Sequence, residues 1–137
     1  MKLVGYNLNK IKAEKKDMLR PKELKINTNM EVEQIKEVKS DAFKTKEEMI
    51  LCSFAYKITY EPDFAEIEFK GNLVISLDPK AAKAAVHDWK KKKMSEDLRI
   101  AIFNVILSKS NIKALQLEEE FNLPHHVPMP SLKPQKE

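Results

Sequence analysis

The sequence predicts an α+β domain in which a four-stranded antiparallel sheet is followed by a short and a long helix, both packed on one face of the sheet. Three observations lead to this prediction. Before residue 78, apolar and polar residues alternate with a period of two in four stretches. After residue 78 the apolar spacing becomes helical. The 137 residues suffice for one domain, which we expect to span residues 1–123, with residues 124–137 as an extended, proline-rich tail.

Two of the strands are expected to form a hairpin. The alternating stretches at residues 50–60 and 65–77 are joined by the short segment EPDF, in which Pro62 and Asp63 favour a tight turn. Each stretch is apolar on one face and polar on the other, as in an antiparallel sheet with one buried face. The apolar faces consist of Ile50, Cys52, Phe54, Tyr56, Ile58 and Tyr60, and of Ala65, Ile67, Phe69, Leu73, Ile75 and Leu77.

Two further strands are expected before this hairpin. The stretch LKINTNMEV places alternate residues on one face from Leu24 to Val32. The stretch LVGYNLNKIKAEK alternates in phase up to Leu8 and out of phase from Ile11, so a one-residue slip separates its two halves. Such a slip predicts a β-bulge near Asn9–Lys10.

Two helices are expected to follow the strands. Asp78 is a suitable N-cap and Pro79 a suitable first residue for the short helix. Ser95 is a suitable N-cap for the long helix, which should run to about Phe121 before Pro124 ends it.

The long helix carries apolar residues on two sides. A helix that covers one sheet needs one apolar face, whereas a helix that is apolar nearly all round must be buried on several sides. One sheet and a short helix cannot cover both stripes, so we expect a homo-oligomer with this helix at the interface. One stripe contains Leu98, Ile102, Val105, Ile112 and Leu115, and the other contains Phe103, Ile106, Leu107, Ala114 and Leu117. The expected interface residues are Leu98, Ile102, Phe103, Val105, Ile106 and Leu107.

Composition excludes several classes of function. The chain has two glycines, so a P-loop or a dinucleotide-binding fingerprint, each of which needs clustered glycines, is excluded. The net charge of +4 comes mainly from lysines, with Arg20 and Arg99 as the only arginines, which argues against specific nucleic-acid recognition. No apolar run approaches the roughly 20 residues of a membrane span, and the first residues do not resemble a secretory leader. The single Cys52 fits a reducing compartment, so we expect a cytoplasmic protein.

The tail contains two adjacent histidines among prolines. In an extended segment the side chains of His125 and His126 point to opposite sides and rarely bind one metal together, and no further ligand follows at a suitable spacing. The prolines favour a polyproline-like ribbon. We expect a tail that docks through Val127, Met129 and Leu132 on the apolar surface of its own chain or of a neighbouring subunit, with no metal and no other cofactor. A metal held between subunits is the alternative.

Three other features allow both a structural and a functional interpretation. His87 and Asp88 share the short helix, but no nucleophile is identified beside them, so we expect no enzymatic activity. Cys52 lies on the apolar face of its strand, which is typical of an inert core thiol. The cluster WKKKK at Trp89–Lys93 either complements the helix dipole or binds nucleic acid or another anionic surface.

The order of the elements, with the run Asn122-Leu123-Pro124 after the long helix, resembles the SecB family of export chaperones. The resemblance covers the chain in architecture from about Lys2 to Leu132. It implies a homotetramer whose long helices lie between two sheets, and an ATP-independent holdase that captures unfolded, apolar polypeptides. The basic net charge and the lack of zinc-binding cysteines in the tail depart from the family, which argues against delivery to the usual export ATPase.

A site for varied apolar polypeptides requires exposed aromatic and methionine side chains, because flexible apolar surface accepts many sequences. The candidates are Phe43 and Phe64 in connections, and Trp89 and Met94 near the turn between the helices. Ordinary packing is the alternative for each of them. Two other functions stay open: a nucleic-acid-binding module that uses Lys90–Lys93, and a structural interaction domain with one dedicated partner.

Overall fold

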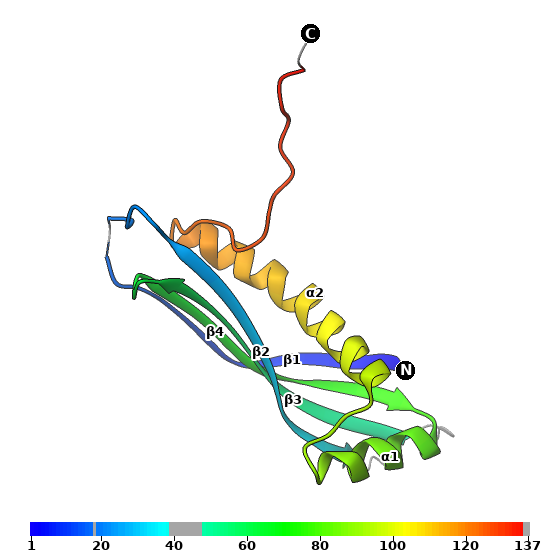
Figure 1. The fold of residues 1–137 in the computed structure, drawn as a ribbon. Helices are drawn as coiled ribbons and strands as arrows, with labels where there is room; N and C mark the ends of the chain where they lie inside the picture. Colours follow the sequence, from blue (N-terminus) through cyan, green and yellow to red (C-terminus); the bar gives the residue numbers. More distant parts are fainter. Residues whose placement is uncertain (18, 39–47, 136–137) are drawn as a thin grey trace.

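The computed structural model describes residues 1–17, 19–38 and 48–135. It consists of a twisted antiparallel sheet with two helices on one face (Figure 1). This arrangement confirms the α+β fold expected from the sequence. The elements are β1 (Lys2–Lys15), β2 (Lys25–Val38), β3 (Glu48–Glu61), β4 (Ala65–Leu77), α1 (Pro79–Trp89) and α2 (Glu96–Glu120).

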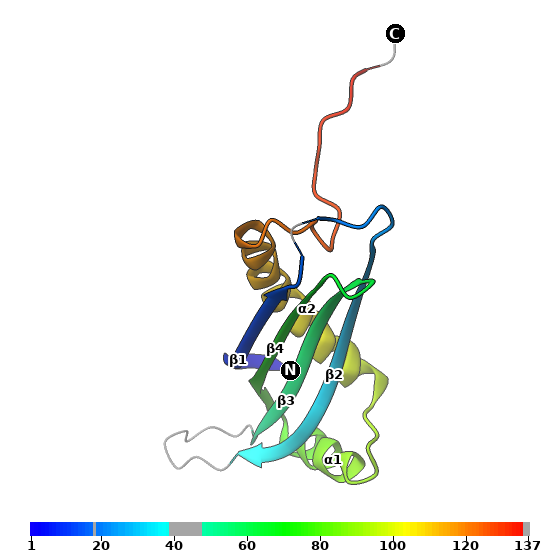
Figure 2. The same ribbon diagram turned by 90° about the vertical axis from the view of Figure 1, so that its left-hand side faces the viewer.

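The strand order in the sheet is β1-β4-β3-β2, and all neighbours are antiparallel. The hairpin of β3 and β4, which the alternating pattern predicts, therefore forms the centre of the sheet. Its central place was not predicted. The consecutive strands β1 and β2 lie at opposite edges (Figure 2), so the connection between them crosses from one edge to the other.

Three register shifts interrupt the strand pairing, and the first lies between Leu3 and Gly5 at the start of β1. The pairing of β1 with β4 shifts between Leu8 and Lys10, which confirms the bulge expected near Asn9. The third is a bulge between Val32 and Gln34 in β2, which brings Ile35 to the buried face three residues after Val32. The expected end of this strand at Val32 is wrong for that reason, because the strand continues to Val38 beyond the break in its alternation.

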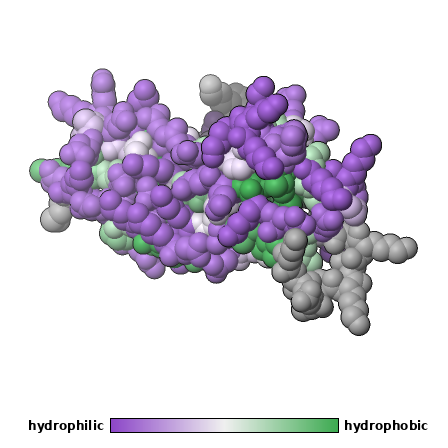
Figure 3. Space-filling view, turned by 90° about the horizontal axis from the view of Figure 1, so that it is seen from below, coloured by the Kyte–Doolittle hydropathy of each residue, from purple (hydrophilic) through white to green (hydrophobic). Residues whose placement is uncertain are grey.

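The core lies between the sheet and the helices. On β3 and β4 every second side chain is buried, and these side chains form one continuous cluster with the inner side of α2. The other face of the sheet carries ion pairs between strands, such as Lys10 with Glu68 at 2.9 Å and Lys57 with Glu66 at 3.5 Å. Seen from below, the surface of the molecule is mostly hydrophilic, with separate apolar patches (Figure 3).

Both helices begin at the residues expected from the sequence. The Asp78 side chain accepts a hydrogen bond of 2.9 Å from the backbone N–H of Ala81, and Pro79 is the first residue of α1. The Ser95 hydroxyl accepts one of 3.3 Å from the backbone N–H of Leu98. These caps satisfy N–H groups that have no partner within the first helical turn.

Candidate polypeptide-binding surface

The two apolar stripes of α2 face different surroundings. The buried residues of the helix recur every three or four positions and pack on the sheet. On the opposite side of the helix, a second set of apolar and small residues recurs with the three-then-four spacing of a heptad. This outer stripe consists of Leu98, Ala101, Val105, Ser108, Ile112 and Leu115, of which Ile112 is 60% exposed and none is fully buried.

The structure divides the expected interface residues between the two sides of α2. Ile102 and Ile106 are wholly buried against the sheet of their own chain, so their expected place at a subunit interface is wrong. Both belong to the face that the central strands cover. Leu98, Phe103, Val105 and Leu107 are half-buried.

Phe64 and Phe43 do not contribute to a described surface. Phe64 is 3% exposed and belongs to the core, so the exposed ring expected from the sequence is wrong. Its backbone N–H donates to the carbonyl of Tyr60 across the hairpin turn, so the residue ends the turn directly before β4. Phe43 lies outside the residues that the structure describes.

Trp89 and Met94 lie on either side of the turn between the helices, and both are half-buried against the core. The Lys92 ammonium lies 4.9 Å from the centre of the Trp89 ring, a cation–π distance. Lys90–Lys93 are all exposed, and their backbone N–H groups donate to the carbonyls that end α1. The basic cluster therefore lies where a helix dipole favours positive charge.

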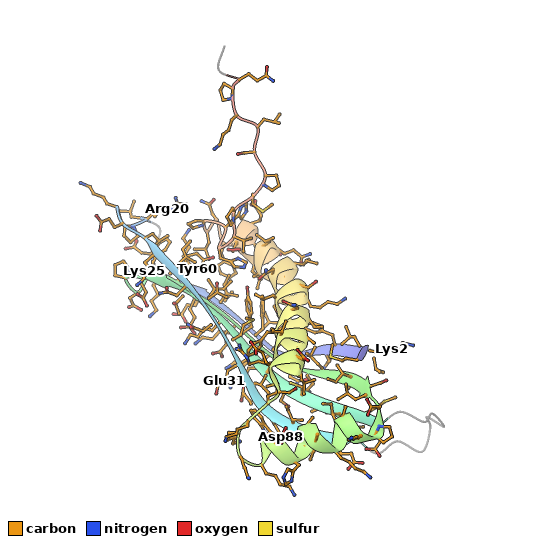
Figure 4. All side chains as sticks on the ribbon, turned by 45° about the vertical axis from the view of Figure 1, so that its right-hand side comes forward. Lys2, Arg20, Lys25, Glu31, Tyr60 and Asp88 are labelled. Atoms are coloured by element: carbon orange, nitrogen blue, oxygen red, sulfur yellow. The ribbon has the colours of Figure 1, made fainter. Side chains whose placement is uncertain are left out.

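An apolar cavity of about 330 Å³ opens beside this turn. It lies between α1, the first turns of α2 and the end of β4, on the part of α1 where Asp88 is labelled in Figure 4. Small side chains leave the space open, and two carboxylates lie among the lining residues. The cavity is lined by Met1, Leu77, Ala81, Ala84, Ala85, Asp88, Ser95, Asp97, Leu98 and Ala101. The sequence pattern did not predict this cavity, although the run AAKAA in α1 indicates a helix with little side-chain volume.

The start of the tail is held by a buried polar network at the other end of α2. Glu118 is fully buried, and the side chain of His126 is 1% exposed. The two side chains meet at 2.7 Å between His126 Nδ1 and Glu118 Oε1, and the backbone N–H of His126 donates to Glu118 Oε2 at 2.9 Å. The Tyr60 hydroxyl donates to the same carboxylate at 2.6 Å. His126 Nε2 lies 2.9 Å from the Tyr56 hydroxyl and 3.0 Å from Asn111 Oδ1.

Burial shapes the electrostatics of this network. Desolvation, with a further contribution from the Glu118 carboxylate, raises the pKa of the Tyr56 and Tyr60 hydroxyls well above the usual value. Both phenols therefore stay protonated as hydrogen-bond donors. In the chain outside the gaps at residues 18, 39–47 and 136–137, no group of three His, Cys, Asp or Glu side chains could hold a metal ion.

The docked tail is confirmed only as far as Val127. His125 and Val127 are half-buried, but every residue from 128 to 135 is exposed, including Met129 at 49% and Leu132 at 101%. Met129 and Leu132 therefore do not tether the tail to its own chain, and their docking on a neighbouring subunit stays a prediction. The segment runs away from the sheet and the helices (Figure 1).

The remaining candidates for chemistry lie apart. Cys52 is wholly buried and burial raises the pKa of its thiol to about 12, as expected for an inert core thiol. His87 is exposed on α1. Neither described helix has the length and apolarity to cross a bilayer.

Comparisons with known proteins relate the chain to one fold. No family model matches the chain, and no curated protein matches it in sequence. Among solved structures, it is similar to the SecB-like chaperone of Mycobacterium tuberculosis in complex with a ChAD peptide from the HigA1 antitoxin. The match covers 98% of this chain and 92% of that chain at 13% identity, with a TM-score of 0.50. This likeness shows the fold: four antiparallel strands followed by two helices, as in a SecB-like chaperone.

Proposed function

We propose that this protein is an ATP-independent holdase chaperone that binds extended, apolar segments of non-native polypeptides. The fold supports the proposal, because the similar chaperone from Mycobacterium tuberculosis was solved with a bound peptide. The proposed activity needs no catalysis and no nucleotide. Buried, reduced Cys52 is compatible with work in the cytoplasm.

The observation that carries the proposal is the open apolar cavity between α1 and α2. Its volume of about 330 Å³ is that of a small binding pocket, and its apolar lining suits an aliphatic side chain of a bound polypeptide. Met94 and Trp89 flank the turn beside the cavity and extend the apolar surface with adaptable side chains. We assign the cavity as the anchor of the polypeptide site and Trp89 and Met94 as its border.

We also propose that the chain works as a homo-oligomer that buries the outer stripe of α2. The heptad spacing of the stripe, with small Ala101 and Ser108 between larger apolar residues, suits close packing of two helices. Exposed Ile112 is the clearest residue to be covered there. A tetramer is the form expected from the SecB-like fold.

The test measures whether the full-length protein suppresses thermal aggregation of a model client without nucleotide at near-stoichiometric ratios. Ala84 lines the cavity and is exposed, so Ala84→Glu places a carboxylate where an apolar anchor would bind. We expect client affinity to fall roughly tenfold, about 1.4 kcal/mol. The matched control is Lys83→Glu, one residue away and outside the cavity lining, which should retain the affinity. The proposal fails if the unmodified protein leaves aggregation unchanged, or if both variants behave alike.

The alternative of nucleic-acid binding is tested in the same samples. Binding through Lys90–Lys93 should weaken steeply with added salt, whereas apolar capture of a client should not. Nucleic-acid binding is favoured if the protein binds DNA or RNA at low salt and the Lys91→Glu variant does not. The location of the four lysines at the end of α1 is also explained by the helix dipole alone.

A further inference from the structure

The C-terminal tail contains an apolar side chain that the described part of its own chain does not cover. Leu132 is fully exposed, and it lies in a segment with prolines at 128, 130 and 134. Such a segment is already extended in the unbound state, so it loses little conformational entropy when it binds. It therefore has the chemistry of a peptide ligand.

The network of Glu118 and His126 fixes the place from which this segment starts. Because His126 is buried at the C-terminal end of α2, only the residues after Val127 are free to reach elsewhere. The tail begins on the same part of the molecule as Tyr60, whereas the cavity lies beside Asp88 at the opposite end, as Figure 4 shows.

The reach of the tail is too short for the cavity of its own chain. His126 is held at Glu118, 17 positions after Ala101, the nearest α2 residue of the cavity lining, and at 1.5 Å per residue this corresponds to about 25 Å. The six residue-to-residue steps from His126 to Leu132 span at most about 22 Å when extended. Leu132 therefore falls short of the cavity at the start of α2 in the same chain, even along a straight path beside the helix, whereas this distance does not limit docking in a second copy.

The cavity matches this segment in both polarity and charge. Its alanine-rich lining suits a leucine side chain, and Asp88 and Asp97 lie among the lining residues. Leu132 is followed directly by Lys133. A leucine in the cavity would place this lysine near the two carboxylates, which adds a favourable charge interaction.

We propose that the tail of one copy, residues 128–135, docks in the cavity of a second copy, with Leu132 inside the cavity and Lys133 beside Asp88 and Asp97. In this arrangement the two-fold axis that pairs the outer stripes is perpendicular to α2, which places the two helices antiparallel. The end of one helix, where the tail begins, then lies beside the start of the other, where the cavity opens. In the resting protein the tail occupies the site that a client would use, and a client must displace it.

The experiment is disulfide trapping between two full-length variants. A chain with Leu132→Cys is mixed with a chain with Ala84→Cys under mild oxidation, and the linked peptides are identified by mass spectrometry. Native Cys52 does not interfere, because it is buried and its thiol stays protonated. We expect the link between positions 132 and 84 to form at least tenfold faster than the link between position 132 and the control Asn29→Cys, an exposed residue on β2.

A charge swap adds a second measurement. Adding Lys133→Glu should slow the 132–84 link about three- to fivefold, the range of a partly exposed ion pair, and Asp88→Lys in the other chain should restore it. Equal rates at positions 84 and 29 would overturn the proposal. The proposal is also overturned if a client with a single cysteine links to position 84 while position 132 does not. That result would assign the cavity to clients alone. The trapping uses no client in its main comparison, so its failure leaves the proposed holdase activity standing.

Discussion

The pair of Glu118 and His126 shows how strongly one buried carboxylate can depend on its neighbours. A buried charge is costly unless it is paired and hydrogen-bonded. Here the carboxylate receives bonds from the His126 ring, the His126 backbone N–H and the Tyr60 hydroxyl. The adjacent pair of His125 with Glu119 lies at the surface, and the Glu119 side chain is 73% exposed. Two neighbouring histidines thus hold chemically similar pairs in opposite environments.

We predict that His126→Ala destabilises the protein and that His125→Ala does not. The first substitution leaves the buried Glu118 without its principal partner, which should lower the free energy of unfolding by about 3 kcal/mol. The second removes an exposed pair worth at most about 1 kcal/mol. Urea unfolding of both variants at neutral pH gives the comparison. Equal losses for the two would mean that the network does not hold the tail.

Sequence patterns could not reveal this network. Glu118 lies in the run LEEEF and resembles a solvated residue, although its helical phase places it one position after buried Leu117. Its partners come from β3 and from the tail, and no local spacing relates these segments. The expectation that His125 and His126 do not share a metal is of another kind. It depends only on local backbone geometry, because neighbouring side chains of an extended segment point to opposite sides.

The edge strand β1 depends on one close backbone contact with β4. A Cβ atom on Gly71 would lie 2.2 Å from the Asn7 carbonyl oxygen and 3.1 Å from Leu8 Cα, so the strands approach more closely than any side chain allows. Gly71 pairs with Leu8 beside the bulge in β1. A bulge changes the regular spacing between the backbones of two strands. Here it brings them so close that only a residue without a side chain fits at position 71.

We predict that Gly71→Ala destabilises the sheet, whereas Gly5→Ala does not. The methyl group at position 71 must displace backbone atoms, which typically costs about 1–3 kcal/mol. A Cβ atom on Gly5 meets nothing within 4 Å, so Gly5→Ala should change stability by less than about 0.5 kcal/mol. The midpoints of thermal unfolding of the two variants test this. A tolerated alanine at position 71 would show that β1 can shift along β4.

Elements were predictable where the period of the pattern was unbroken. The alternation in β3 and β4, and the caps at Asp78 and Ser95, are local signals, and the structure confirms them. The far half of β2 was missed because the bulge at Val32 and Gln34 breaks the period. The strand order was not predicted, since it depends on pairing between distant segments.

At the scale of the whole molecule, α2 determines what one chain can cover. Its inner side completes the core, and on its outer stripe Leu98 and Val105 reach the core only in part while Ile112 is exposed. The sequence predicted two apolar stripes but could not show that Ile102 packs on the sheet of its own chain. The helical phase of a residue does not say which side of the helix the strands cover. The cavity was missed for a related reason: it arises from the packing of α1 against the start of α2.

We predict that Ile112→Lys separates the subunits while the fold stays intact. Each two-fold contact across the outer stripe would contain two copies of this residue, so the dissociation constant should rise roughly a hundredfold, about 3 kcal/mol. The matched control is Ile100→Lys, on the same helix and 48% exposed but outside the outer stripe, which should leave the subunits associated. Light scattering at micromolar concentration, with circular dichroism as a check of folding, measures both. If the unmodified protein is a single subunit at this concentration, the outer stripe is not an interface. Docking of the tail in the cavity of a second copy would then need another contact between the two chains.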